Sequence, residues 1–156
     1  MEAKGNIELE IIRKFWFDEV RPPIMEALVK TPDDKLDWMP AEGMLSLGNI
    51  FMHIAEAGDW WIDKMIDGKD YEDIVPGPSY PKKDIEAMLN NHWKRLEHFY
   101  DRCPEIAERK IPHTRKGKKH MLTGGWIMMH LFEHDIHHRS QINQYLRILG
   151  IEPPKI

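Results

Sequence analysis

Four long segments of this chain carry apolar residues at helical spacing, and clusters of proline and glycine separate them. No alternating apolar run of useful length appears except a short stretch near Ile111. The pattern predicts helices over about residues 6–30, 46–66, 82–102 and 124–149. Four such helices joined by moderate loops favour an all-α fold, an antiparallel four-helix bundle, with residues 1–156 as a single domain.

Individual residues mark where these helices begin, bend and end. Pro22-Pro23 predicts a kink or a division in the first helix, because proline removes a backbone donor and clashes with the preceding turn. Ser46 and Thr123 are predicted N-caps of the second and last helices, since their hydroxyl groups can accept unpaired amide protons. Pro104 is predicted to end the third helix.

Composition and charge narrow the class of protein. The chain has 22 basic and 26 acidic residues and a net charge of −4, which disfavours a nucleic-acid binder. Its one compact basic run, residues 115–119, lies in a segment predicted to be irregular, with a short extended arm. No apolar run approaches the ~20 residues of a membrane-spanning helix. Cys103 is the single cysteine and no signal-peptide pattern is present, so we expect a cytoplasmic protein without disulfides.

The last predicted helix contains four histidines, and two of them are spaced so that both can bind one metal ion. At ~100° per residue, His134 and His138 fall on or beside the apolar arc, whereas His130 and His137 point toward the polar side. Because His134 and His138 are four residues apart, their rings stand one turn above the other and can converge on one ion. The alternative is that both are hydrogen-bonded core histidines.

A third ligand must come from another helix, because two imidazoles hold a divalent ion poorly. His53 is the best candidate, since it lies in the middle of the second helix and shares a face with apolar neighbours. A polar ring in that position needs a partner, and coordination through its neutral form would provide one. The sequence therefore predicts a metal site formed by His53, His134 and His138.

Three stretches of the chain resemble the DinB-like superfamily. They are LDWMPAEG at residues 36–43, LGNIFMHIA at 47–55 and HLFEHDIHHRSQI at 130–142. The shared pattern is one histidine on the second helix and His-x-x-x-His followed by Arg-x-Gln on the last, and the resemblance spans almost the whole chain. Ser140 stands where the pattern usually has glycine.

This resemblance implies a four-helix bundle, often a homodimer, whose three histidines bind a divalent metal such as nickel or zinc. Residue by residue, those ligands fall on His53, His134 and His138. Members of the superfamily include bacillithiol- and mycothiol-dependent S-transferases and a thiol-dependent isomerase, and many others are described as metal-dependent hydrolases. The resemblance therefore implies a small-molecule substrate and a low-molecular-weight thiol as a further cofactor.

Two more residues are candidates for the chemistry of such a site. Glu56, about one turn after His53, can act as a general base or orient water, or it can be an ordinary solvated carboxylate. Arg139 can form an ion pair with Asp135, four residues earlier, or bind a carboxylate of the thiol cofactor. Of these two interpretations, the ion pair with Asp135 is preferred.

Three functions remain open from the sequence. A three-histidine site with an open coordination position can hold a thiol as thiolate, or lower the pKa of water for hydrolysis. The leading hypothesis is a thiol-dependent S-transferase of the bacillithiol type, acting in detoxification or stress response. The alternatives are a metal-dependent hydrolase and a non-catalytic, stress-associated binding or scaffold bundle.

Overall fold

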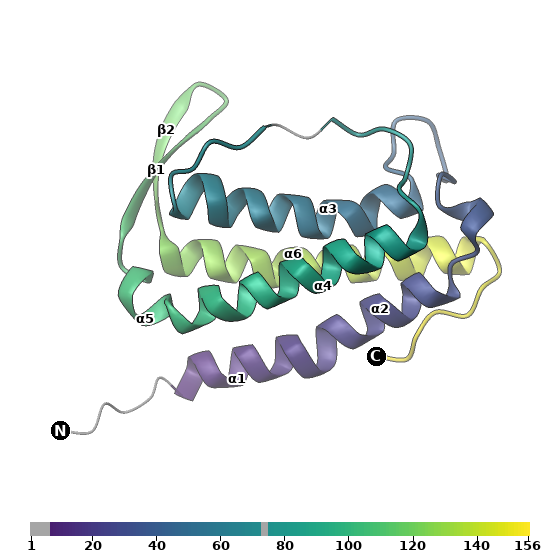
Figure 1. The fold of residues 1–156 in the computed structure, drawn as a ribbon, viewed down its shortest axis with the longest axis horizontal. Coiled ribbons are helices and arrows are strands. Elements are labelled where there is room, and N and C mark those ends of the chain that lie inside the picture. Colours follow the sequence, from purple (N-terminus) through teal and green to yellow (C-terminus); the bar gives the residue numbers. More distant parts are fainter. Residues whose placement is uncertain (1–6, 73–74) are drawn as a thin grey trace.

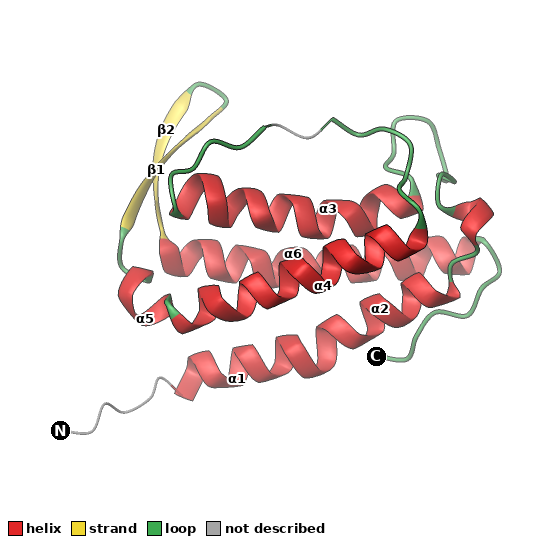
Figure 2. Ribbon diagram, in the orientation of Figure 1, coloured by secondary structure: helices red, strands yellow, loops and turns green. Residues whose placement is uncertain are grey.

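The computed structural model describes residues 7–72 and 75–156 (Figure 1). Its helices are α1 (Ile7–Phe15), α2 (Arg21–Lys30), α3 (Leu47–Trp60), α4 (Lys82–Asp101), α5 (Cys103–Ile106) and α6 (Gly124–Ile148). The strands β1 (Lys110–Arg115) and β2 (Lys118–Thr123) form a small hairpin at one end of the bundle (Figure 2). The all-α bundle is thus confirmed, with this hairpin as an addition. The predicted start of the first helix at residue 6 lies outside the described residues.

Two wider turns lie within the predicted helices, one at the division predicted near Pro22-Pro23 and one in the second half of the second predicted helix. The π-helical turn Trp16–Val20 joins α1 to α2, and a second one, Trp61–Ile66, continues α3. The first predicted helix is therefore divided just before Pro22-Pro23, and these prolines lie in the first turn of α2. A proline there costs no hydrogen bond, because the first amide groups of a helix have no partner within it.

The long helices run up, down, down and up along the bundle (Figure 1). Asp59 contacts His92, and Asp67 farther along contacts Arg102, so residue numbers rise together and the two segments are parallel. Figure 1 shows that α2 runs parallel to α6, whereas α3 runs antiparallel to α6 and α2 to α4, and each of these pairs is in contact. Only two of the four neighbouring pairs are therefore antiparallel, because the connection after α3 returns the chain to the end where α3 began.

Two predicted N-caps are present in the structure, whereas one predicted helix end lies earlier in the chain than expected. Ser46 Oγ accepts a hydrogen bond from the amide of Asn49 at 3.3 Å, and Thr123 Oγ1 accepts one from Trp126 at 3.1 Å. Both N-caps are confirmed. Helix α4 already ends at Asp101, and Pro104 instead lies in the first turn of the short helix α5.

The segment predicted to be irregular with a short extended arm forms a two-stranded hairpin over most of its length. Its strands pair antiparallel, with Arg115 opposite Lys118, and the turn between them has positive φ at Lys116 (49°) and Gly117 (73°). Two consecutive residues of this kind fit a type I′ turn, whose twist matches that of the strands. The alternation signal is weak because Ile111 is the one described residue of β1 that is buried. None of the described helices combines the length and apolar character needed to cross a membrane.

Candidate metal centre

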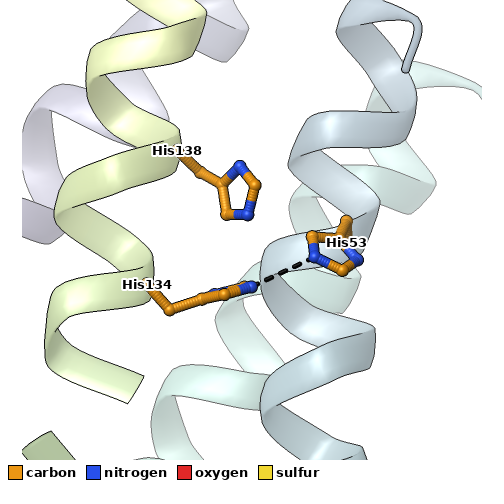
Figure 3. Close-up of side chains that lie close together, drawn as sticks. All are labelled: His53, His134 and His138. Atoms are coloured by element: carbon orange, nitrogen blue, oxygen red, sulfur yellow. Dashed lines mark hydrogen bonds between the residues drawn. The ribbon is translucent and has the colours of Figure 1, made fainter. Parts of the chain in front are cut away.

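Three imidazole rings from two antiparallel helices converge inside the bundle. His53 projects from the middle of α3, and His134 and His138 project from successive turns of α6 (Figure 3). The Nε2 atoms of His53 and His134 are 3.1 Å apart. One ring nitrogen from each of the three residues lies within 4.8 Å of the others. The structure thus brings together all three predicted ligands, 81 residues apart in the case of His53 and His134.

The donor set fits a divalent ion. Two nitrogens that each lie ~2.0–2.1 Å from a tetrahedral ion are about 3.3 Å apart, close to the observed separation between His53 and His134. The Nδ1–H group of His138 donates to Gln141 Oε1 at 2.9 Å, which leaves Nε2 of His138 with its lone pair. A second hydrogen bond of this kind is how proteins orient metal-binding imidazoles. The three histidines can therefore form a metal site.

Burial keeps two of these rings in the neutral form that binds metal. Desolvation, with a smaller contribution from His134, lowers the pKa of His53 to about 4. Desolvation is also the largest cause that lowers the pKa of His138, to about 3, and the next largest is again His134. Both rings are neutral at pH 7, so an ion does not have to displace protons from them.

These pKa values predict that the metal-free protein loses stability as the pH falls from 7 to 5. In this range the unfolded chain protonates histidines near their ordinary pKa of ~6.5, whereas the folded protein leaves His53 and His138 neutral. The unfolded state then binds more protons, so the free energy of unfolding decreases with decreasing pH. Urea denaturation of chelator-treated protein at several pH values measures this. The slope should be smaller in His138→Gln and unchanged in His137→Gln, and equal slopes in all three proteins would contradict the prediction.

A buried carboxylate next to the centre has partners that the sequence did not indicate. Asp135 is 2% exposed, and its Oδ2 accepts hydrogen bonds from the indole of Trp16 at 2.7 Å and of Trp93 at 3.4 Å. Its Oδ1 lies 3.9 Å from Nδ1 of His134, too far for a hydrogen bond, and that nitrogen is buried without a partner. Asp135 therefore connects α6 to the segments that carry Trp16 and Trp93, at the position next to His134 in the chain.

The predicted ion pair between Asp135 and Arg139 is wrong. Among the residues that the structure describes, no such pair forms, and Arg139 donates instead to the main-chain oxygen of Glu19 at 3.0 Å. Burial lowers the pKa of Arg139, whose side chain lies on the α1–α2 side of α6 and outside the cavity next to His53. The structure thus does not bring Arg139 together with the three histidines as a cofactor-binding residue.

Glu56, in contrast, lies beside the centre in a cavity of about 190 Å³. The cavity is lined by Leu45, Asn49, His53, Glu56, Ala57, Trp60, Tyr71 and Pro76. Burial raises the pKa of the Glu56 carboxyl group. Because Glu56 and His53 line the same small and mostly apolar space, a molecule in it can contact the candidate base and a candidate ligand at once.

The two remaining histidines of α6 lie where the angular argument placed them. His137 is exposed, and His130 is half-buried with its ring stacked on Trp126. The ring centroid of His130 is 6.0 Å from that of His134, and neither His130 nor His137 belongs to the converging group. Helical geometry was enough to separate the two pairs.

Comparisons with known proteins agree with this architecture. A family model described as the DinB family matches residues 2–156. A DinB-like protein from Bacillus subtilis has a similar solved structure, with a TM-score of 0.68 and 21% identity over 94% of this chain and 96% of that one. A DinB-like protein from Bacillus cereus gives a TM-score of 0.68 and 19% identity over the same shares. No curated protein matches the chain.

Proposed function

The chain belongs to the DinB family, and we propose that it is a divalent-metal-dependent enzyme that transfers the sulfur of a low-molecular-weight thiol to a small electrophile. The observation that carries this proposal is the convergence of His53, His134 and His138 beside a cavity that also contains Glu56. A three-histidine donor set leaves coordination positions for a reactant, which is typical of catalytic sites. A purely structural zinc site has four protein ligands.

The residues around the centre have distinct roles in this proposal. A nickel or zinc ion held by the three histidines would supply Lewis acidity, which favours the anionic form of a thiol at neutral pH. The apolar walls formed by Leu45, Ala57 and Trp60 receive the body of the electrophile and limit access of water. Glu56 accepts the thiol proton, because burial raises its pKa toward the range useful for a base near pH 7.

The position of Glu56 also favours a second candidate function, metal-dependent hydrolysis. The same carboxylate can take a proton from water instead of a thiol, and its raised pKa suits either nucleophile. The two functions differ in one observable property. Only the S-transferase requires an added thiol for turnover.

The test uses monochlorobimane as the electrophile, bacillithiol or cysteine as the thiol, and protein loaded with nickel or zinc. In the expected reaction a C–S bond forms, chloride leaves and Glu56 receives the thiol proton. Fluorescence should increase only with thiol and metal together, and Glu56→Gln should lower kcat by roughly 10²-fold or more. The exposed Glu133 lies outside the cavity, so Glu133→Gln is the matched control.

Other outcomes of this experiment decide against the S-transferase. Metal-dependent cleavage of p-nitrophenyl acetate without thiol, lost in Glu56→Gln, would assign the hydrolase instead. No turnover of either reagent by metal-loaded protein would favour the non-catalytic binding or scaffold bundle.

The homodimer implied by the family resemblance stays a prediction. The exposed large apolar side chains of α1 and α6 include Ile11, Phe15 and Met129. Phe15 also contacts Phe132 of α6 edge to face, which joins the two helices into one surface. We infer that this α1–α6 surface is where a second copy would bind.

A further inference from the structure

A second cavity, of about 390 Å³, lies between the β-hairpin, the π-helical turn that follows α3 and the start of α6. Its walls are formed by Leu122 together with aromatic and basic side chains: Trp61, His113, Arg115, His120, Trp126 and His130. None of these residues lines the cavity next to His53. We propose that this second cavity binds a small planar organic anion, an aromatic carboxylate. Its volume is within the ~300–1,000 Å³ typical of small-molecule sites.

Flat aromatic surfaces form the walls of this cavity. The rings of Trp126 and His130 stack at 5.0 Å with an interplanar angle of 11°. Trp61 packs against both, with ring centroids 5.8 Å from Trp126 and 5.1 Å from His130. Trp126 is nevertheless 46% exposed, an unusual amount for an indole already held by neighbours. A planar ligand ring would cover this apolar surface by stacking.

The charge of the cavity favours an anion. Arg115 contributes a guanidinium group from β1, and His113 and His120 face each other across the hairpin as a register pair. The lining residues include no Asp or Glu, and the one described carboxylate paired with a lining residue is the exposed Glu133, whose Oε2 lies 3.7 Å from Nδ1 of His130. No ion pair among residues 7–72 and 75–156 involves Arg115. The planar fork of arginine matches a carboxylate in a bidentate arrangement. An arginine beside stacked rings, with no carboxylate partner in the described part of the chain, is thus complementary to a carboxylate attached to a flat ring.

The second cavity shares no lining residue with the cavity next to His53, but it lies close to the three-histidine centre. His130 lines the second cavity, and its ring centroid is 6.0 Å from that of His134. The imidazole ring of His130 would therefore separate a bound aromatic anion from the centre. The proposal does not depend on the proposed function, because none of its binding groups is a candidate metal ligand.

The test is isothermal titration calorimetry with 2-naphthoate, on both metal-free and metal-loaded protein. We expect saturable binding in both forms, because the metal centre does not contribute. Trp126→Ala and Arg115→Gln should each weaken binding by roughly tenfold, the usual effect of losing one stacking wall or one charge-assisted contact. The neutral analogue 2-naphthylmethanol should bind about tenfold more weakly than 2-naphthoate. Both substituted residues are exposed, so the variants should fold.

A matched control variant separates a built site from general attraction to the basic hairpin. Lys118 lies opposite Arg115 in the register and does not line the cavity, so Lys118→Gln removes the same charge without touching the ligand. It should leave binding unchanged. Equal weakening in Lys118→Gln and Arg115→Gln would overturn the proposal, as would weakening in His53→Ala or no binding at millimolar 2-naphthoate.

Discussion

We expect His134→Ala to lose most of its bound metal and His137→Ala to retain near-stoichiometric metal, which is the largest difference that we expect between two single substitutions in this protein. His134 contributes one of three converging nitrogens, and its Nε2 is 3.1 Å from that of His53. Loss of a first ligand should lower affinity by about a hundredfold or more, beyond the 10–100-fold typical of groups that only orient a ligand. The measurement is elemental analysis of tag-free protein after incubation with nickel or zinc. His53→Ala and His138→Ala should behave like His134→Ala.

The control for this experiment lies on the same helix. His137 is exposed and its ring contacts that of His138, so its loss changes the surroundings of a ligand without removing one. Thermal unfolding of each variant shows whether it is folded, and His134→Gln replaces His134→Ala if the smaller side chain prevents folding. Equal metal loss in His137→Ala and His134→Ala would contradict the assignment of ligands. A metal-free wild type after incubation with each ion would contradict the site itself.

Asp135→Ala should destabilise the fold by about 3 kcal/mol, because two buried indole N–H groups lose their acceptor. Trp16 and Trp93 are fully buried, and both donate to Oδ2 of Asp135. Asp135→Asn keeps an acceptor oxygen at the same position, so its cost should be about 1 kcal/mol, the charge-assisted part of the interaction. Urea denaturation at pH 7 without metal measures both values.

An acidic residue two positions away provides the comparison. The side chain of Glu133 is 69% exposed, and Glu133→Ala should change the free energy of unfolding by no more than about 0.5 kcal/mol. If Asp135→Ala were as mild as Glu133→Ala, the two indole hydrogen bonds would contribute little. Metal affinity of folded Asp135→Asn then reports whether the carboxylate also supports His134.

The candidate ligands could be found from the sequence because each signal is local. Helical periodicity places residues four apart on one face, which was enough to select His134 and His138 over His130 and His137. His53 was found by a weaker argument, that a polar ring on an apolar face needs a partner. The caps at Ser46 and Thr123 are equally local, since each hydroxyl group accepts from an amide three residues later.

Interactions between distant segments could not be found in this way. Asp135 and Arg139 are neighbours at helical spacing, yet Asp135 binds two indoles from other helices and Arg139 binds a main-chain oxygen 120 residues away. Opposite charges four residues apart predict a pair only when no better partner exists. Inside a bundle, buried donors such as the indole of Trp16 compete for the carboxylate, and periodicity contains no information about them.

The sequence by itself determined the helical class, the caps and the face of α6 that carries His134 and His138, because the regular rise of a helix depends on neighbouring residues alone. Only the tertiary structure decided that α3 and α4 run parallel, that residues 110–123 form a hairpin, and that Glu56 shares a cavity with His53 while Arg139 does not. These features depend on which surfaces exclude water together, and that is settled when the helices pack.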